Sequence, residues 1–210
     1  MTLPRGALPI GSNNPSPRLI LASESPRRTA LLAQAGITPD WICPAKIDET
    51  PRRAELPRLY AARMAAAKAE TVARSWEGDP ALVLAADTVV AAGRRILPKA
   101  ETADEVRACL DQLSGRRHVV FTAIAVVGSR ATHPLRSRLV ATRVSFKRLS
   151  SDEMDSYVAS GEGNGKAGGY AIQGRAEGFV RALNGSYSNV VGLPLLETLT
   201  LLGGFGYVVC

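Results

Sequence analysis

The spacing of hydrophobic residues predicts strands and helices in alternation along this chain. Short apolar runs between turn residues predict strands at 18–23, 81–90, 118–128 and 137–149, with a return strand at 94–100 that closes a hairpin. Helical spacing with start and stop residues predicts helices at 26–35, from near Pro57 to 76, at 102–115, at 150–161 and from Pro194 onward. The order indicates an α/β fold with a mixed central sheet and flanking helices.

Four other stretches complete the predicted organisation. Residues 1–17, rich in Pro, Gly, Ser and Asn, predict a flexible leader before a domain at 18–210, and residues 40–51 predict a loop. The sequence "EGNGKAGGYAIQG" at 162–174 contains five glycines, which indicates tight turns or a ligand-binding loop. Residues 178–192 predict a strand, an Asn-Gly turn and a second strand or loop.

Composition narrows the possible classes of protein. The chain of 210 residues has a formal net charge of +7, but basic residues form no long block and only 5% of residues are aromatic, which disfavours nucleic-acid binding. Three widely separated cysteines without a CxxC motif predict a reducing cytoplasm, and His118 and His133 have no partner at zinc-ligand spacing. With no apolar run of about 18 residues, we expect no membrane-spanning helix.

The helix predicted at 26–35 has an unusual first turn. Ser25 suits the N-cap and Pro26 the first helical position, yet Arg27 and Arg28 follow at once. This is the positive end of the helix dipole, where a cation is unfavourable by about 0.3–1 kcal/mol. A bound anion such as a polyphosphate would remove the conflict, because backbone N–H groups and both guanidinium groups would face one negative charge. Two solvated arginines are the alternative.

Asp87 interrupts the apolar run "ALVLAADTVV". A carboxylate in a buried strand is destabilising unless it is paired, hydrogen-bonded or bound to a metal. Functional groups gather at the carboxyl ends of strands in open α/β sheets, which favours a catalytic or metal-binding role. An aspartate that caps a turn at the strand end is the alternative.

Other charged residues extend this candidate site, each with a plainer alternative. Lys68 lies on a partly apolar helical stripe, and Lys99 follows the predicted hairpin. Asp48 and Glu49 either bind Mg²⁺ or only belong to a surface loop. Carboxylates surrounded by cations fit phosphoryl or pyrophosphoryl chemistry, because Mg²⁺ binds one or two carboxylates together with substrate phosphates. The chain lacks the P-loop, the GxGxxG motif after its first strand and the GxSxG elbow.

Four stretches, in the same order, resemble the Maf family of nucleoside triphosphate pyrophosphatases. They are "LILASESPRRTALLAQAGI", "AADTVV", "GKAGGYAIQG" and "GSYSNVVGLPL", and the similarity runs from about Arg18 to near the C-terminus. The resemblance implies an elongated, two-lobed α/β fold of the inosine-triphosphatase type, with a cleft between the lobes and a homodimer. It also implies hydrolysis of a nucleoside triphosphate to the monophosphate and pyrophosphate with a divalent cation, Mg²⁺, Mn²⁺ or Co²⁺.

The same resemblance implies roles for individual residues. Asp87, in "ADT", is the expected proton acceptor, and Glu49, in "IDE", is the expected metal-site carboxylate. Asp87 is also a candidate metal ligand, and a role chiefly as a ligand is the alternative to a role as the base. The residues expected to bind substrate are two arginines and two lysines at the phosphates and two residues near the base: Arg27, Arg28, Lys68, Lys99, Thr88 and Gln173.

Gln173 indicates the substrate branch. "GYAIQG" is similar to the branch that acts on dTTP and UTP, whereas the branch acting on 7-methyl-GTP usually carries Glu at this position. A glutamine oxygen can accept from the N3–H of uracil or thymine while its NH₂ donates to a ring carbonyl. A base that leaves these groups unpaired would be rejected.

Three positions depart from the family pattern. Ala100 stands where proline usually follows the lysine, Gly165 stands where an acidic residue usually precedes "KAGGY", and Glu24 gives "SESP" in place of "SGSP". Glu24 either pairs with an arginine or points to solvent. A broader or 7-methyl-GTP-type pyrophosphatase and a non-enzymatic regulator of septation are the alternative functions.

Overall fold

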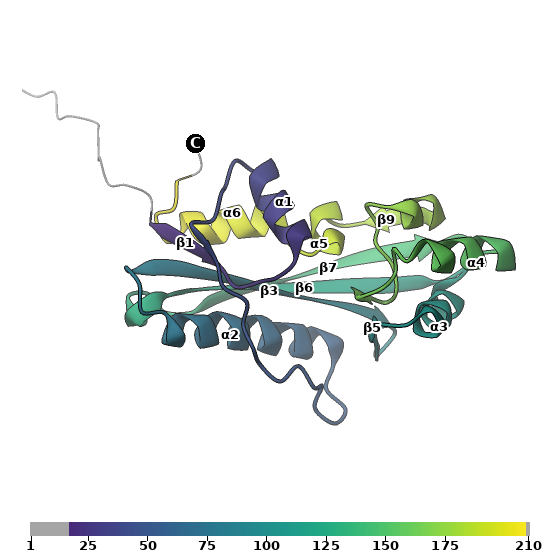
Figure 1. Cartoon of the computed structure of the whole chain (residues 1–210), viewed down its shortest axis with the longest axis horizontal. Coiled ribbons are helices and arrows are strands. Elements are labelled where there is room, and N and C mark those ends of the chain that lie inside the picture. Colours follow the sequence, from purple (N-terminus) through teal and green to yellow (C-terminus); the bar gives the residue numbers. More distant parts are fainter. Residues whose placement is uncertain (1–16, 209–210) are drawn as a thin grey trace, which may run out of the picture.

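The computed structural model describes residues 17–208, so residues 1–16 of the predicted leader lie outside the described residues. A mixed main sheet runs the length of the molecule in the order β2-β1-β3-β6-β7-β9, with β4 paired to β3 (Figure 1). Its strands are β1 (Arg18–Leu21), β2 (Trp41–Ile42), β3 (Ala81–Ala92), β4 (Arg95–Leu97), β6 (Arg117–Gly128), β7 (Arg136–Phe146) and β9 (Val180–Asn184). Strand β1 is parallel to β2 and β3, and the other pairs are antiparallel, as a mixed sheet requires.

Helices cover both faces of this sheet. The long α2 lies along one face, α1, α5 and α6 lie over the other, and α3 and α4 gather at one end of the elongated molecule (Figure 1). The helices are α1 (Pro26–Gln34), α2 (Pro57–Ser75), α3 (Ala103–Leu113), α4 (Ser151–Ser160), α5 (Tyr187–Val191) and α6 (Leu195–Gly203), with 3₁₀ turns at Ser129–Ala131 and Arg175–Phe179. The predicted α/β class with a mixed sheet and flanking helices is confirmed. Among the described residues, no helix combines the length and apolarity needed to cross a membrane.

Strand β3 is buried on both faces, which explains its continuous apolar run. Side chains alternate along a strand, so Val83, Ala85 and Val89 pack toward α2 while Leu84 and Val90 pack into the core on the other face. The face of α2 turned to the sheet is built from small residues, including Ala61, Ala65, Ala69 and Ala73. A small-residue face allows α2 to pack closely on β3, and this brings polar groups of the two elements within contact distance.

The region after β9 differs from its prediction. The sequence predicts a second strand or loop after the Asn-Gly turn of residues 178–192, whereas the structure has the short helix α5 there. The Ser186 side chain caps this helix by accepting the N–H of Asn189 at 3.2 Å. Asn189 is buried and its amide donates to Val120 O and Thr142 Oγ1. These tertiary hydrogen bonds stabilise a helix in a segment whose polar residues suggested a loop.

Two very short pairings also escaped the sequence patterns. Trp41–Ile42 forms β2 inside the predicted 40–51 loop, paired with β1. Lys99–Ala100 forms β5, which pairs with β8 (Lys166–Ala167) inside the glycine-rich stretch. Each strand has only two residues, so the pairing depends on contact between distant segments. Strand β5 thereby ties the end of the predicted hairpin to the glycine-rich stretch.

One edge of β3 is left open in its middle. Strand β6 pairs with β3 from Leu82 to Ala91, whereas the opposite edge is shared by β1, paired to Ala81–Leu84, and β4, paired to Val90–Ala92. Between them, described strands leave residues 85–89 unpaired on that edge. Asp87 lies at the centre of this gap, so it is not at the end of its own strand but just beyond the carboxyl end of β1.

Candidate active site

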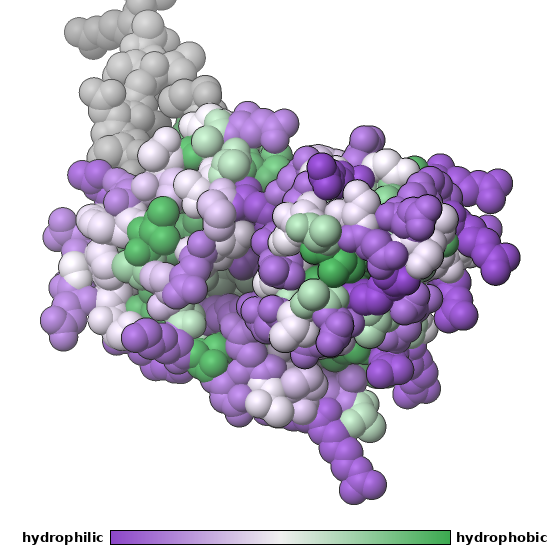
Figure 2. Space-filling model, turned by 45° about the vertical axis from the view of Figure 1, so that its right-hand side comes forward, coloured by the Kyte–Doolittle hydropathy of each residue, from purple (hydrophilic) through white to green (hydrophobic). Residues whose placement is uncertain are grey.

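A pocket of about 360 Å³ opens beside the gap in the edge of β3. The surface is hollowed between two masses of side chains, in agreement with the two-lobed shape expected (Figure 2). The pocket brings together segments from the first turn of α1, the loop after β2, α2, β3, the glycine-rich stretch and α5. It is lined by every residue to which the family resemblance gives a role: Arg27, Arg28, Glu49, Lys68, Asp87, Thr88, Lys99 and Gln173.

Lys68 bridges the two carboxylates of the site. Its ammonium lies 2.7 Å from Asp87 Oδ1 and 2.8 Å from Glu49 Oε1. Asp87 and Lys68 are 6% and 9% exposed, so the pair is shielded from water. The Tyr60 hydroxyl of α2 donates to Glu49 O at 2.7 Å and fixes the loop over the helix. Lys68 is therefore part of the site and not a surface lysine.

The environments of the two carboxylates move their pKa values in opposite directions. Burial raises the pKa of Asp87, although Lys68 and Arg28 oppose the rise. Burial also acts to raise the pKa of Glu49, but contact with Lys68 outweighs it and the net shift is downward. A raised pKa suits a carboxylate that takes up a proton, and a lowered pKa suits one that stays ionised.

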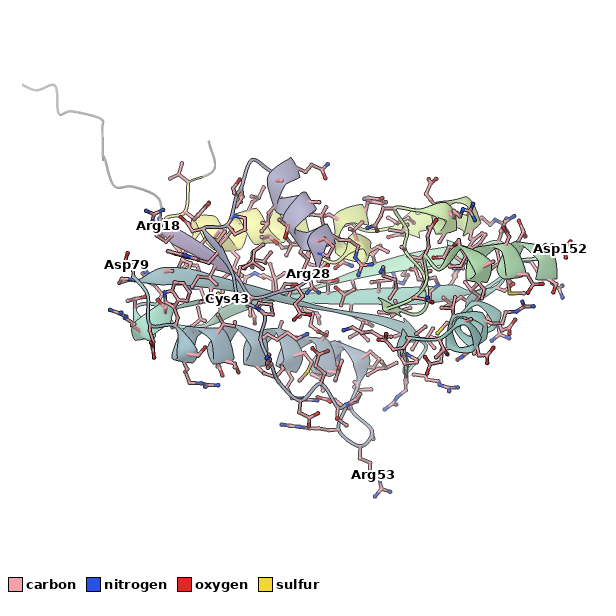
Figure 3. The ribbon with its side chains drawn as sticks, in the orientation of Figure 1. Arg18, Arg28, Cys43, Arg53, Asp79 and Asp152 are labelled. Atoms are coloured by element: carbon pink, nitrogen blue, oxygen red, sulfur yellow. The ribbon has the colours of Figure 1, made fainter. Side chains whose placement is uncertain are left out.

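Arg28 lies near the middle of the molecule, between α1 and the sheet (Figure 3). Its Nε donates to Gly192 O at 2.9 Å, and its terminal nitrogens donate to Ser23 Oγ at 2.9 Å and Thr88 Oγ1 at 3.3 Å. All three acceptors are uncharged, so none of these hydrogen bonds pairs the guanidinium group with a carboxylate. The pocket therefore contains a fixed, desolvated positive charge, and burial lowers the pKa of Arg28.

Thr88 was expected near the nucleobase, and its hydroxyl lies within hydrogen-bond distance of Arg28 and 3.0 Å from Thr122 Oγ1. Thr122 in turn donates to Asn189 O of α5 at 2.8 Å. Because side chains alternate, Thr88 points to the opposite face of β3 from Asp87. Its visible contacts position Arg28, and its role toward the base stays a prediction.

The first turn of α1 places a positive charge without a carboxylate partner at the pocket. Ser25 occupies the N-cap position, but its side chain makes no capping hydrogen bond. Within residues 17–208, Arg27 has no hydrogen bond or ion pair, and burial lowers its pKa. Glu24 is exposed and forms no ion pair with any described residue, so of its two alternatives it points to solvent. The turn is thus open to an anion.

The glycine-rich stretch forms the opposite wall. Gln173 is exposed at the pocket and makes no hydrogen bond to another described residue. Lys166 also lines the pocket, and burial together with nearby Arg27 lowers its pKa. The sequence reasoning did not single out Lys166, although the glycine-rich motif that contains it was the available signal. Lys99 is 62% exposed and lies 3.9 Å from Glu49 Oε2.

Comparison with known proteins identifies the family. The family model described as "Maf-like protein" matches residues 18–205. The chain belongs to the Maf-like family. Its relatives include proteins named dTTP/UTP pyrophosphatase in Rhodopseudomonas palustris strain HaA2, 58% identical over 91% of this chain and 93% of that protein, and in Caulobacter vibrioides, 60% identical over 91% and 97%.

A solved structure shares the fold of this Maf-like protein. A HAM1 protein from Coxiella burnetii superposes with a TM-score of 0.51 over 89% of this chain and 98% of that chain, at 19% sequence identity. At this identity the likeness concerns the fold alone.

The acidic residues of this Maf-like protein fit a metal only together with a ligand. The described part of the chain holds no group of three or more His, Cys, Asp and Glu side chains that could bind a metal ion. Glu49 and Asp87 do supply carboxylate oxygens on one pocket wall, and Mg²⁺ commonly binds one or two carboxylates plus substrate phosphates. Asp48 lies elsewhere, and its Oδ1 accepts the N–H of Thr50 at 2.9 Å, so it belongs to the loop as the plainer alternative expected.

Proposed function

We propose that this Maf-like protein is a nucleoside triphosphate pyrophosphatase that hydrolyses dTTP and UTP to the monophosphate and pyrophosphate. The observation that carries the proposal is the buried Asp87–Lys68 pair, whose ammonium also contacts the partly exposed Glu49, in a pocket that Arg27 and Arg28 line as well. The names of the relatives, dTTP/UTP pyrophosphatase, support the same activity.

The positive charges of the pocket would bind the triphosphate. Arg27, Arg28, Lys68, Lys99 and Lys166 line one cavity, whereas a free nucleoside offers no charge for them to meet. Arg28 is held by neutral acceptors, so its charge is available and its geometry is already fixed before substrate binds. Such preorganised cations stabilise the charge that develops on the phosphates without reorganising at the moment of reaction.

Asp87 would act as the general base. It accepts a proton from water as the water oxygen forms a bond to the α-phosphorus, and the bond from that phosphorus to the bridging oxygen breaks. The electron pair leaves with pyrophosphate, whose charge the arginines and lysines stabilise. The raised pKa of Asp87 strengthens it as a proton acceptor, and the ammonium of Lys68 holds the carboxylate in place.

A divalent cation, Mg²⁺, Mn²⁺ or Co²⁺, is part of this proposal. Glu49 and Asp87 would hold it together with phosphate oxygens, and when bound it neutralises phosphate charge. Chelation with EDTA is expected to stop pyrophosphate release and added Mg²⁺ to restore it. Undiminished release in EDTA would contradict the metal requirement.

Gln173 would select the base. Its amide group has no partner among the described residues and lies at the pocket wall, free to pair with the N3–H and a carbonyl of uracil or thymine. Gln173→Glu removes the donating NH₂ and is expected to lower dTTP and UTP hydrolysis by about 10-fold or more. Glu177→Gln, an exposed change that lies outside the pocket, serves as its control.

The deciding experiment measures pyrophosphate release from dTTP, UTP, CTP and 7-methyl-GTP with Mg²⁺ present. Preference for dTTP and UTP is expected. Preference for 7-methyl-GTP, or similar rates with all four, would replace the proposed substrate by the other or broader specificity. Release from none, together with salt-sensitive DNA binding, would favour a non-enzymatic regulator.

A homodimer and a cytoplasmic location stay predictions. Light scattering on the purified chain tests the first, and fractionation of cells that express it tests the second. A monomer at micromolar concentration would contradict the dimer.

A further inference from the structure

Aromatic side chains gather beneath the glycine-rich wall of the pocket. His118, Phe146, Tyr157, Tyr170 and Phe179 contact one another edge to face, with ring centroids 5.0–6.1 Å apart. Elsewhere the core is built mainly from aliphatic residues and alanine. This aromatic cluster is thus confined to one part of the core. It meets the pocket at Tyr170, which belongs to the cluster and also lines the pocket.

His118 has a polar contact inside this cluster that packing alone does not require. It lies on β6, is 2% exposed, and its Nε2 shares a hydrogen bond with Tyr170 Oη at 2.8 Å. Its Nδ1 is buried without a partner among the described residues. An unpaired buried nitrogen is unfavourable, and a phenylalanine would fill the space without it. The retained imidazole therefore points to a role for the bond to Tyr170.

Tyr170 and Ala171 are held on both sides. The Ala171 N–H donates to the Tyr157 hydroxyl at 3.1 Å, next to the bond between Tyr170 and His118. Just before them, Gly168 and Gly169 both have φ near +68°, so the chain reverses there. A Cβ on Gly168 would also lie 2.8 Å from Val90 of β3. The segment is therefore fixed in position by its neighbours.

Gln173 follows this fixed segment at once. Residues 170–173 line the pocket, but Gln173 itself is exposed and has no hydrogen bond in the described chain. Its position toward a ligand therefore depends on how firmly Tyr170 and Ala171 are held. Before Gln173, the His118–Tyr170 and Tyr157–Ala171 hydrogen bonds hold the segment, and after it the Arg175 N–H donates to Glu162 Oε2 at 2.8 Å.

We propose that His118 is a positioning residue for base selection, which acts through Tyr170 to hold residues 170–173 so that Gln173 faces the base. The inference rests on the proposed function for the identity of the ligand. That His118 fixes residues 170–173 through Tyr170 does not depend on the proposed function. His118 does not line the pocket, so we expect its effect to fall on base recognition through Tyr170 and to leave the phosphate site unchanged.

Three variants separate the hydrogen bond from the packing. His118→Phe and Tyr170→Phe each remove the bond and keep a ring in place, whereas His118→Gln keeps a polar group able to bond Tyr170. His133→Phe is the matched control, because His133 packs on Phe205 outside the pocket. Each variant is compared in KM and kcat for dTTP and GTP, in inhibition by inorganic tripolyphosphate, and in amide exchange of residues 170–173.

The variants are expected to weaken recognition of the base and to leave binding of the phosphates almost unchanged. In His118→Phe and Tyr170→Phe, KM for dTTP rises about five- to tenfold, preference for dTTP over GTP falls by a similar factor, and exchange at 170–173 increases. Tripolyphosphate inhibition and kcat change less than about twofold. The double variant is no worse than either single one, and His118→Gln recovers most of the selectivity.

Two outcomes would overturn the inference. Unchanged exchange at 170–173 would show that the bond does not hold the segment. Increased exchange with unchanged preference between bases would show that the hold does not serve selection. Wild-type protein that releases no pyrophosphate from any nucleotide would instead defeat the proposed function, and the exchange measurement would still decide whether His118 positions the segment.

Discussion

The pocket has two walls that are built in different ways. The charged wall, formed by Arg27, Arg28, Glu49, Lys68 and Asp87, is held by ion pairs and by bonds from charged groups to neutral acceptors. The loop wall, residues 167–173, is held by glycine turns, aromatic packing and neutral hydrogen bonds.

The difference follows from the ligand proposed. A nucleoside triphosphate carries all its charge at one end, so the charged wall supplies compensating charge and a proton acceptor. The base is uncharged, and an uncharged ligand is discriminated by hydrogen bonds that a wrong partner leaves unsatisfied. Changes in the charged wall should therefore affect turnover and stability, and changes in the loop wall should affect selectivity. The following four predictions test this division.

The largest effect is expected at Asp87. Asp87→Asn removes the proton acceptor but keeps the shape, and pyrophosphate release should fall by about 10³-fold. Circular dichroism and thermal unfolding should show a folded protein, because Lys68 retains Glu49 as a partner. Asp48→Asn, a carboxylate outside the pocket, is the control and should remain within about twofold of wild type. Near-normal turnover in Asp87→Asn would show that Asp87 is not the general base.

The next effect concerns stability of the charged wall. Lys68→Met leaves Asp87 and Glu49 facing each other without their shared cation, and should lower the unfolding free energy by about 3 kcal/mol. Adding Asp87→Asn should recover part of the loss, since one of the unpaired charges is then gone. Urea unfolding measures both variants, with the exposed Lys46→Met as control. Purely additive losses would indicate that Lys68 does not serve these carboxylates.

A smaller, pH-dependent effect on stability is expected at His118 of β6, which supports the loop wall from below through Tyr170. Burial lowers the pKa of His118 to about 4 in the folded chain, against about 6.5 when unfolded. Below pH 6.5 the unfolded chain binds a proton at His118, whereas the folded chain does not. The free energy of unfolding therefore has its full value above pH 6.5 and decreases as pH falls toward 4.

Between pH 7 and pH 5, wild type should therefore lose about 2 kcal/mol more stability than His118→Gln, which does not titrate there. Urea unfolding at the two pH values gives the comparison, and the contributions of all other groups cancel in the difference. Parallel losses in both proteins would mean that His118 is not kept neutral by burial.

The smallest effect returns to the first turn of α1. Arg27 lies at the positive end of a helix dipole without a partner among the described residues, so Arg27→Gln should raise the stability of the ligand-free protein by about 0.5 kcal/mol. The same change should weaken tripolyphosphate binding about 10-fold.

Arg53 provides the control for this change. It points away from the molecule at the tip of the 49–56 loop (Figure 3), so Arg53→Gln should change neither quantity. Arg28→Gln should differ from Arg27→Gln by lowering stability, because it loses bonds to Ser23, Thr88 and Gly192. A ligand-free protein destabilised by Arg27→Gln would indicate a structural role for Arg27.

Patterns among neighbouring residues were enough to predict the local features of the fold. The long apolar run of β3 and the helical spacing of α2 are patterns within a few residues, and each was confirmed. The oddities within those patterns, Asp87 in an apolar run and two arginines at a helix start, were also visible locally. Together with the family motifs, they predicted eight residues that line the pocket, whereas Lys166 was not singled out.

Other features form only when distant segments of the chain come together. The gap in the edge of β3, the β5–β8 pair and helix α5 each need contacts between residues far apart in the chain. The same is true of the Lys68 bridge and of the bond between His118 and Tyr170, 52 residues apart. Local patterns indicate which residues are unusual, because the neighbours of a residue in the sequence predict whether its position is buried and which charge it favours. Only folding brings a carboxylate, its cation and the wall that faces them into one pocket.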